Sequence, residues 1–582
     1  MKLYATYKQI LAEIQKEDRI KKAYFTSFNL SPEFVERYII PPIYGEEVPS
    51  NELHYENINN VIENTKLDLK FFYDANMLKI DESKRTIAKF YPILLKNGVF
   101  HPKVIYIEGE KFVYLFVGSA NLTLNGWGRN TEAFRIVKFD KKDNLYNEVY
   151  NFFDDVFRLA NIKKTTPRKK PTVKSKLNFI YSFDGKSNFI ENLQLGKNLQ
   201  VWSPYFSDLD ELVQEISFKS LENINIIPDL IDGQKIRLKQ KPVDSRISFY
   251  CEDELMENMN KFNHAKVWIS DTKIAIGSYN MSKQAINGTN FEASLIEDIE
   301  KNHDFKIQGD LIEDIQVEEK VDELINEDSL TETYRYKGLY ELVANWKTRS
   351  LSILSYGDIN ENVSIIMPSS VEVPYKDVGE LNVNQTTAIF SALVRNKIFT
   401  VRDKNDVIFR GLIEEQECKG YRDNLKAENL EDIFDFFIEE KDNKLIENLE
   451  ERILKKTSLY SYNHQDSFIN GFQKNYFTMF KGFKNLKTKL NSIKTNEKKL
   501  HSFCFSSVVS LTTIILILEQ EKKKQEKNLF LYLCIEEINK IIVLANKLIK
   551  SIENFSELKE IKNIELLLTK EDKNFLKACE NV

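Results

Sequence analysis

The chain has 582 residues, of which 42% are hydrophobic and 29% charged, and its formal net charge at pH 7 is −6. This length suits several domains, and the composition is that of ordinary globular proteins, which excludes a disordered or fibrous chain. The five cysteines are scattered without the CxxC or Cys/His spacing of metal ligands, which argues against a disulfide framework or a zinc site and predicts reduced thiols in a cytoplasmic protein.

No segment is expected to enter a membrane. The N-terminus is amphipathic and polar, without the uninterrupted apolar core of a signal peptide. The most apolar run, Phe503 to Leu518, contains several Ser and Thr and is shorter than the ~20 apolar residues that a membrane-spanning helix needs. We therefore expect this run to be a buried helix of a soluble bundle.

Two stretches of the chain repeat one order of elements. The first has a β-rich run, a helix start at Ser31 and Pro32, and a second β-rich run; the second has a strand, a helix with an acidic first turn, and a strand. Each stretch continues into a strand that follows a histidine, and then into another strand. This alternation predicts an α/β fold with two pseudo-symmetric repeats, mixed sheets and flanking helices. The expected strands are 23–28, 67–72, 199–204 and 224–228, and the expected helix of the second stretch is 208–216.

A polar motif closes each stretch. It consists of His-x-Lys, an apolar run, Gly-Ser-x-Asn, a Gly and Asn-x-Glu, in this order. His-x-Lys alone is a common chance match, and the later elements make the motif specific. A pattern written twice in one chain indicates one site built by two halves. The first copy comprises His101, Lys103, Ser119, Asn121, Asn130 and Glu132, and the second His264, Lys266, Ser278, Asn280, Asn290 and Glu292.

These residue types suit an attack on a phosphodiester. His and Lys two positions apart on a strand point from the same face, so one strand can deliver an imidazole and an ammonium to one phosphate. The Ser and Asn of the following turn can donate hydrogen bonds to phosphate oxygens, and the Asn of Asn-x-Glu is expected to bind substrate. The Glu is suited to hold an imidazole by its second nitrogen. The strand-end residues Thr26, Ser27, Asn29, Ser203 and Tyr205 either lie near this site or are ordinary loop residues.

The paired motif resembles that of the phospholipase D superfamily, whose signature is HxK(x)4D followed by GSxN. The second copy matches it in full with Asp271, whereas the first copy has Glu108 at the acidic position. Both acidic residues are expected to support the site. The resemblance implies two repeats about a pseudo-twofold axis, a covalent phosphohistidine, and no metal or other cofactor. It also implies that His101 is the nucleophile and His264 the general acid, a choice that the spacing itself does not make.

The remaining chain shows architecture without further motifs. A helix is expected over 145–159, and residues 163–176 carry seven positive and no negative charges, which indicates a solvated linker or a flexible phosphate-backbone contact. Residues 304–346 are expected to be mostly helical or irregular. Residues 351–414 are expected to be rich in strands, with a hairpin over 399–412. The chain from 425 onward is expected to be helical, with apolar stripes over 430–438 and 529–550. The expected domains are a first repeat (1–160), a basic linker (161–176), a second repeat (177–305), a connecting helix with a β-rich accessory domain (306–422) and a C-terminal helical domain (423–582).

Fold and motif do not choose among phosphodiesters, because the same kind of site opens any that fits. The lack of a visible membrane anchor, and the resemblance of GSANLTLNGWGRNTE to restriction-associated bacterial members, favour a nuclease acting on DNA rather than RNA. Residues 1–300 hold 41 basic and 41 acidic side chains, without the basic excess of a free-standing DNA binder. A protein partner such as an ATPase, bound through the C-terminal helical domain in an anti-phage or restriction system, is therefore expected to help hold DNA. Self-association, a phospholipase or transphosphatidylase activity, and a decayed phosphate-binding scaffold stay open as alternatives.

Overall fold

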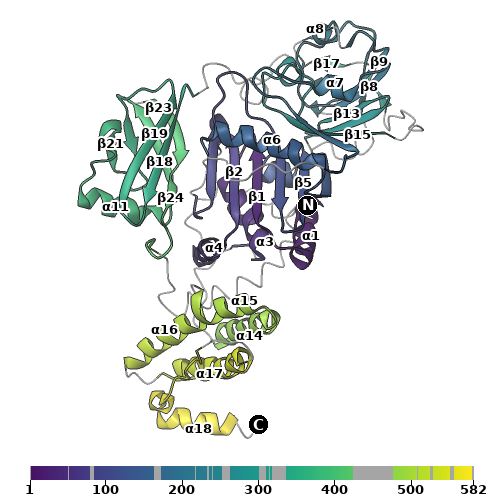
Figure 1. Cartoon of the computed structure of the whole chain (residues 1–582). Coiled ribbons are helices and arrows are strands. Elements are labelled where there is room, and N and C mark those ends of the chain that lie inside the picture. Colours follow the sequence, from purple (N-terminus) through teal and green to yellow (C-terminus); the bar gives the residue numbers. More distant parts are fainter. Residues whose placement is uncertain are drawn as a thin grey trace. The chain divides into compact units, whose positions relative to one another are not determined.

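The computed structural model describes residues 2–46, 48–49, 52–78, 84–162, 172–215, 218–231, 235–238, 240–251, 262–299, 310–313, 315–317, 336–404, 406–423, 476–507, 509–524, 528–550 and 556–579. The chain divides into two compact units (Figure 1): residues 1–40 with 66–421, and residues 41–65 with 422–582. The second unit begins beside the predicted start of the helical domain. It also contains segment 41–65, which the sequence had placed in the first repeat.

The first repeat is a six-stranded mixed sheet covered by helices. Helix α6 (Asn144–Leu159), predicted from the sequence, lies across one face (Figure 1) and buries Val149 and Phe153 against the strands. Helix α1 (Lys2–Glu17) places Tyr7 against Phe116 and Trp127, with ring centroids 6.3 and 5.3 Å apart. The strand order is β3 (Lys89–Ile93), β2 (Asp68–Asp74), β1 (Lys22–Ser27), β4 (Val104–Glu108), β5 (Phe112–Gly118), β6 (Phe134–Asp140).

The second repeat has the same central order in an eight-stranded sheet. β1 runs parallel to β2 and antiparallel to β4, and their counterparts β8, β9 and β13 are paired in the same senses. The predicted α/β fold of two pseudo-symmetric repeats is thereby confirmed. The strand order is β16 (Asp310–Leu311), β12 (Ile247–Cys251), β9 (Asn223–Ile227), β8 (Asn198–Trp202), β13 (Val267–Ser270), β14 (Lys273–Gly277), β15 (Ala293–Asp298), β7 (Leu177–Tyr181).

Short elements complete the two repeats. Ser31 caps a helical segment of the first repeat by accepting a hydrogen bond from the Phe34 N–H, as its sequence predicts. Most of the predicted basic linker, residues 163–171, lies outside the described residues. The helices are α2 (Pro32–Phe34), a π-helical turn (Val35–Ile39), α3 (Ile40–Tyr44), α5 (Leu124–Gly128), α7 (Phe189–Leu193), α8 (Leu209–Val213) and α10 (Lys283–Ile286), and β10 (Leu230–Ile231), β11 (Lys235–Ile236) and β17 (Gln316–Val317) form a small sheet.

The repeats share one core where they meet. Phe152 of α6 stacks on Phe291, which precedes β15, with ring centroids 5.5 Å apart, and also contacts Phe179 of β7. Isolated β-bridges join Phe100 to Phe291 and Thr131 to Asn263. In each bridge, one partner directly precedes a motif histidine and the other directly precedes a motif glutamate. The packing between the repeats therefore places motif residues of one beside those of the other.

A β-rich accessory part follows the repeats. The predicted hairpin over 399–412 is confirmed by the pairing of β22 (Ile398–Asp403) with β23 (Asp406–Leu412). The expectation of helical or irregular structure up to residue 346 is wrong for β18 (Gly338–Asn345), because its pairing with β19 (Ser350–Gly357) overrides the helix-compatible composition of this run. Helix α11 (Val383–Leu393), which begins with a capping box from Asn382 and Gln385, was not anticipated. The remaining strands are β20 (Ser364–Ile366), β21 (Glu372–Pro374) and β24 (Glu414–Gln416).

Buried charges fasten this accessory part to the first repeat. Lys397 Nζ lies 2.5 Å from Glu415 and donates to the backbone oxygens of Arg85 and Thr86 at 3.0 and 2.9 Å. The side chains of Lys397 and Glu415 are fully buried. Truncating either partner would leave an uncompensated buried charge, which typically costs 3–5 kcal/mol.

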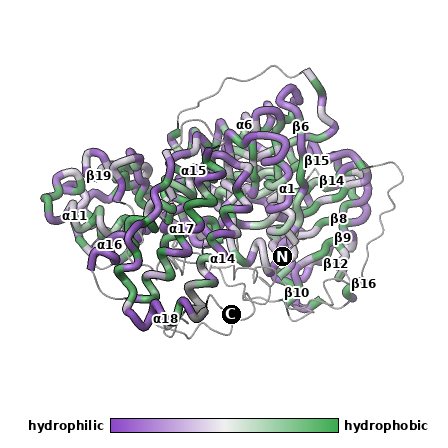
Figure 2. The backbone as a smooth tube through the Cα atoms, turned by 90° about the horizontal axis from the view of Figure 1, so that it is seen from below, coloured by the Kyte–Doolittle hydropathy of each residue, from purple (hydrophilic) through white to green (hydrophobic). Residues whose placement is uncertain are grey.

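The second unit is helical where it is described. Helix α17 (Leu529–Ile549) confirms the predicted apolar stripe over 529–550 and is largely green in Figure 2. The stripe predicted over 430–438 lies outside the described residues. Helix α4 (Glu52–Asn64) joins this unit through the ion pair of Glu56 with Arg422 at 2.8 Å and the hydrogen bond of Ser507 to Asn57 at 2.9 Å. The other helices are α14 (Tyr476–Ile493), α15 (Glu497–His501), a π-helical turn (Ser502–Ser506), α16 (Leu511–Lys523) and α18 (Lys570–Cys579).

One described segment, Lys499–Lys523, is long and apolar enough to cross a membrane by composition, and 47% of its apolar window is buried in the protein. The backbone of this segment is not one helix. Ser510 adopts an extended conformation and caps α16, which leaves 13 residues from Leu511 to Lys523. Such a helix is about 20 Å long, whereas a hydrocarbon core is about 30 Å thick. As expected, this run contributes buried core, with Ile514 and Leu518 fully covered.

Candidate active site

The first motif histidine is fixed by the second repeat. His101 lies just before β4, and its backbone N–H donates to the Phe291 carbonyl at 2.9 Å. Its Nδ1 lies 2.8 Å from Oε2 of Glu292, and both side chains are fully buried. The glutamate that orients this imidazole therefore comes from the other copy of the motif, 191 positions along the chain.

The second motif histidine is fixed by the first repeat in the same way. The His264 N–H donates to the Thr131 carbonyl at 2.9 Å, and Nδ1 of its ring lies 2.9 and 3.0 Å from the two oxygens of Glu132. The two pairs form a crossed arrangement in which each repeat supplies one imidazole and the carboxylate for the other. Neither half of the site is complete without the other repeat.

The motif serines hold these glutamates. Ser119 Oγ donates to Glu132 at 2.5 Å and accepts from the Ala133 N–H at 3.0 Å. Ser278 donates to Glu292 and accepts from the Ala293 N–H. A hydroxyl has one donor, so the prediction that these serines donate to phosphate oxygens is wrong for this arrangement. Each serine instead sets the rotamer of a carboxylate that orients the opposite histidine.

The asparagines of Asn-x-Glu belong to the same support. Asn130 Nδ2 donates to Glu132 Oε1 at 3.2 Å, and Asn290 Nδ2 contacts Glu292 Oε1 at 3.4 Å. The Asn290 carboxamide oxygen also accepts from the Val99 N–H at 3.1 Å, and its side chain is fully buried. The predicted contact with substrate is therefore wrong for Asn290, because both ends of its amide are engaged with protein. The structure gives both asparagines a contact to the orienting carboxylates.

Both motif lysines lie beside the histidines and are buried. Lys103 Nζ donates to the His101 carbonyl at 3.0 Å, and Lys266 Nζ lies 2.8 Å from Nε2 of His264. An ammonium group has donors only, so this second contact assigns the lone pair of His264 to Nε2 and the proton to Nδ1, which faces Glu132. Lysine and imidazole thus meet in one place, as expected for two residues spaced i and i+2.

Polar strand ends hold the Gly-Ser-x-Asn turns. In the first repeat, Ser27 Oγ accepts the Leu122 N–H at 2.9 Å, and the Asn29 N–H donates to the Asn121 side-chain oxygen at 3.2 Å. In the second, Ser203 Oγ accepts the Met281 N–H at 3.1 Å next to the fully buried Asn280. The strand-end polar residues of the sequence therefore lie at the site. A Cβ on Gly118 would lie 2.3 Å from the Ala133 oxygen, so this turn requires glycine.

Two aspartates contribute that the motif search did not find. Asp74 ends β2 and accepts the Phe100 N–H at 2.8 Å, and Asp229, shortly after β9, accepts the Asn263 N–H at 2.7 Å. Each therefore anchors the residue directly before a motif histidine. The sequence carries a signal for both, since an Asp follows the second β-rich run of each repeat in FFYD and IIPD. Burial raises the pKa of Asp229, opposed by its ion pair with Arg237.

The acidic residues of the HxK(x)4D pattern lie away from the histidines. Glu108 is at the far end of β4, roughly 20 Å of strand from His101. It pairs with Lys22 and Lys141, each at 3.1 Å. Burial opposes its ionisation, but the Tyr106 hydroxyl and these lysines hold its pKa below the usual value. Asp271 accepts from the Asn198 amide at 2.8 Å and organises the turn before β8. Both support the sheets rather than a bound phosphate.

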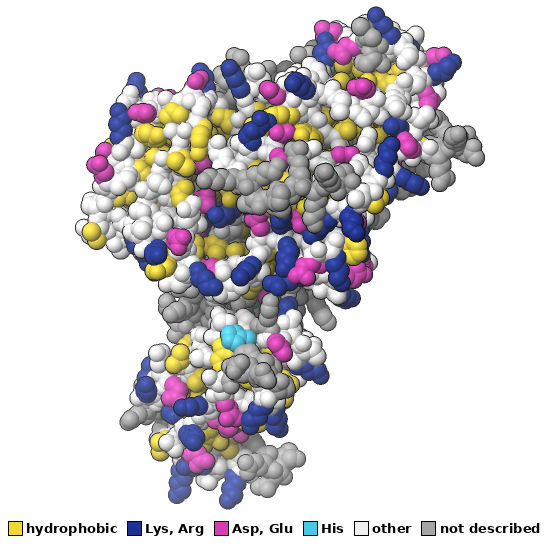
Figure 3. Space-filling model, viewed as in Figure 1, with side chains coloured by type: hydrophobic (Ala, Val, Ile, Leu, Met, Phe, Trp, Pro, Cys, Tyr) yellow, Lys and Arg dark blue, Asp and Glu magenta, His cyan; other side chains and the backbone are white. Residues whose placement is uncertain are grey.

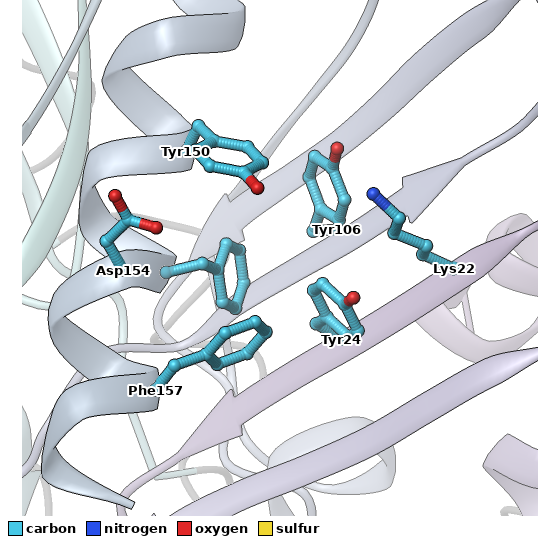
Figure 4. A pocket seen from close by; sticks show the side chains of 7 residues that line it. Lys22, Tyr24, Tyr106, Tyr150, Asp154 and Phe157 are labelled. Atoms are coloured by element: carbon cyan, nitrogen blue, oxygen red, sulfur yellow. The ribbon is translucent and has the colours of Figure 1, made fainter. Parts of the chain in front are cut away.

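A small cavity lies beside Glu108, between α6 and the sheet (Figure 4). Its lining combines aromatic rings with Lys22 and Asp154. The Tyr24 hydroxyl donates to Asp68 at 2.5 Å and the Tyr106 hydroxyl to Glu108 at 2.6 Å, so these polar groups are satisfied within the protein. This cavity is separated from the histidines by the length of the strand and forms no part of the candidate site.

Charged side chains of both signs lie on the surface of the described residues (Figure 3). On the face drawn in Figure 3, basic and acidic side chains of the described residues are interspersed. Within the described part of the chain, no three His, Cys, Asp or Glu side chains are grouped so as to hold a metal ion.

No protein-family profile and no curated protein matches the sequence. Among solved structures, yeast tyrosyl-DNA phosphodiesterase is 13% identical over 48% of this chain and 84% of that chain, with a TM-score of 0.35. Polyphosphate kinase from Porphyromonas gingivalis is 12% identical over 51% of this chain and 43% of that chain, with a TM-score of 0.32. At these values the likeness covers about half of this chain and is partial.

Proposed function

We propose that this protein is a phosphodiesterase of the phospholipase D superfamily that hydrolyses DNA through a covalent phosphohistidine and without a metal ion. The observation that carries the proposal is the crossed pairing of His101 with Glu292 and of His264 with Glu132. Two imidazoles, each oriented by a buried carboxylate and each beside a lysine, are the groups that a two-step displacement at phosphorus requires.

In the first step, Nε2 of His101 bonds to phosphorus while the bond from phosphorus to the leaving oxygen breaks. Glu292 stabilises the positive charge that His101 acquires. His264, entering this step as the imidazolium, gives its Nε2 proton to the leaving oxygen. Lys103 and Lys266 stabilise the charge on the non-bridging oxygens.

In the second step, the neutral His264 takes a proton from water as the water oxygen bonds to phosphorus. The bond between phosphorus and His101 breaks, and its electron pair returns to Nε2. The phosphate monoester leaves, and both histidines regain their starting protonation states. Glu132 stabilises the imidazolium of His264 before the first step and after the second.

The contact between Lys266 Nζ and His264 Nε2 must be exchanged when substrate binds in this scheme. A bound phosphodiester offers anionic oxygens, which are stronger partners for an ammonium group than an imidazole nitrogen is. Transfer of Lys266 to such an oxygen frees Nε2 to carry the proton that the first step needs. Substrate binding therefore prepares the general acid.

The proposed DNA substrate rests on the sequence resemblance and the lack of a visible membrane anchor rather than on charge, because the catalytic half has no basic excess. The proposed intracellular location rests on the scattered cysteines. We propose that a protein partner, such as an ATPase bound through the helical unit, provides part of the grip on DNA. Such a pairing suits an anti-phage or restriction system.

The test compares plasmid DNA and phosphatidylcholine vesicles as substrates, both in EDTA. We expect DNA cleavage by the wild-type protein and none by H101A. H264A should lose at least ~10²-fold in turnover and accumulate phosphorylated His101. Conversion of lipid alone contradicts the nuclease proposal, loss of DNA cleavage in EDTA contradicts the metal-free mechanism, and label on His264 reverses the two roles.

A further inference from the structure

The pseudo-symmetry allows the two sides of the site to be compared residue by residue. Ser27 and Ser203 each accept the N–H of the residue after a motif asparagine, and each donates to the carbonyl two positions on. Asn29 in the first repeat therefore corresponds to Tyr205 in the second. In the same way, Val99 corresponds to Phe262, two positions before each histidine.

The partners of the two anchoring aspartates also differ. Asp74 accepts from the backbone and side-chain nitrogens of Asn76, both at 2.9 Å. Asp229 instead forms an ion pair with Arg237, which directly follows β11. The histidine frame is thus the same on both sides, whereas the residue two positions before the histidine is aliphatic on the His101 side and aromatic on the His264 side, where the anchoring aspartate also pairs with an arginine.

The residues on the His264 side form a continuous wall. The Phe262 ring centroid lies 5.5 Å from the His264 ring and 6.1 Å from the Tyr205 ring. The Arg237 guanidinium lies over the Phe262 ring at 5.1 Å from its centroid. Phe262 is partly exposed and the Arg237 side chain is 20% exposed, so this pair presents surface to a ligand.

The His101 side has an aromatic neighbour of a different kind. The Phe28 ring lies 5.1 Å from His101 with its edge turned to the imidazole, and Lys103 lies over the same ring. Phe28 is fully buried. Phe28 therefore packs against His101 and Lys103 within the core and offers no surface on which a base could stack.

We propose that the Phe262–Arg237 pair, backed by Tyr205, is a subsite that stacks a nucleobase next to the scissile phosphate on the His264 side. Aromatic rings and guanidinium planes both stack on bases of any sequence. Asp229 ties Arg237 to the backbone just before His264 through the Asn263 N–H, so the subsite is held in register with the general acid. The subsite rests on the proposed nuclease function and deepens it, because it assigns the base contact to the leaving strand.

The experiment uses the full-length protein in EDTA and a set of single-stranded oligonucleotides. One keeps all its bases, one lacks the base on the leaving side of the scissile phosphate, and one lacks the base on the retained side. The end that keeps the phosphate after cleavage identifies the two sides. We expect kcat/KM to fall about tenfold or more when the leaving-side base is removed and to stay within twofold when the retained-side base is removed.

The variants F262L and R237K make the test specific. Leucine keeps apolar volume without a π face, and lysine keeps the charge and the pairing with Asp229 without a planar group. Each variant should lose about tenfold on the complete oligonucleotide and lose nothing further when the leaving-side base is absent. Their activity on that abasic oligonucleotide should equal the wild-type activity, which shows that the catalytic groups are intact.

Failure of the proposed subsite and failure of the proposed nuclease function give different results in this experiment. Equal losses for the two abasic oligonucleotides, or a leaving-side dependence that persists in F262L and R237K, overturn the subsite while leaving the nuclease standing. No cleavage of any oligonucleotide by the wild-type protein overturns the nuclease proposal, and the subsite with it.

Discussion

The crossed carboxylates are most sharply tested by the substitution Glu292→Gln. This side chain is fully buried, contacts Nδ1 of His101 at 2.8 Å and receives the Ser278 hydroxyl. Glutamine keeps the size but removes the charge that favours a positively charged His101. A hydrogen bond to a charged group contributes about 1.5–3 kcal/mol, which corresponds to roughly 10- to 150-fold. We therefore expect kcat to fall by at least tenfold with a small change in KM, because the lost interaction strengthens as His101 becomes phosphorylated.

The assay is DNA cleavage in EDTA combined with rapid-quench detection of the phosphohistidine. Phosphorylation of His101 should be slowed in E292Q although His101 and Lys103 are unchanged. The matched control is Glu297→Gln on the same strand, β15, where the glutamate pairs with Arg135 at the surface and contributes about 0–1 kcal/mol. Wild-type phosphorylation rates in E292Q, or equal losses in E292Q and E297Q, would refute the crossed arrangement as the source of activity.

Three further predictions concern the lysines, the turn glycines and the half-buried Glu341. Lys266→Ala should reduce kcat by about 10²-fold or more, because the charge that stabilises the transition state is lost. The control is Lys273→Ala, which should leave kcat unchanged in the same assay, because the Lys273 ammonium lies 3.7 Å from Asp298 on the next strand. Gly118→Ala should lower the free energy of unfolding by about 1–3 kcal/mol in urea titrations, because its Cβ would meet the Ala133 oxygen, whereas Gly379→Ala, which has open space, should be neutral. Burial, with a contribution from the charge of Glu414, raises the pKa of Glu341 from 4.5 to about 7. The folded protein therefore loses stability as pH rises from 4.5 to 7, and Glu341→Gln should gain about 1–3 kcal/mol over wild type at pH 8 and little at pH 4.5; equal effects at both pH values would contradict this.

Contacts between residues that are close in the sequence could be predicted from the sequence alone. A histidine and a lysine two positions apart in extended backbone lie on the same side of the chain, so their meeting could be predicted although both precede the strand. The repeat order was also readable, since strand and helix signals recur with each motif. The assignment of Glu132 to His264 could not be made, because it depends on how two sheets pack across 132 positions of chain.

Other outcomes depended on competition between partners. The hydroxyl of a serine after glycine could donate a hydrogen bond to a phosphate oxygen. The hydroxyl of Ser119 instead donates its one hydrogen bond to the neighbouring buried carboxylate of Glu132. Asp74 and Asp229 act on backbone N–H groups, which every residue has, so no residue pattern marks their targets. The strand β18 was missed because Leu, Glu and Ala also suit helices, and only its pairing with β19 decides.

The placement of segment 41–65 has a consequence for how the protein is made. This segment leaves the ribosome more than 350 residues before residue 422, where the rest of its unit begins. Domains generally fold during synthesis from the N-terminal end, but this unit can close only after the residues that follow 422 have been made. A product that ends before Phe483 leaves Leu53 of α4 without the buried apolar residues against which it packs, and exposed apolar surface of this kind favours proteolysis. Segment 41–65 therefore remains without its packing partners during most of synthesis.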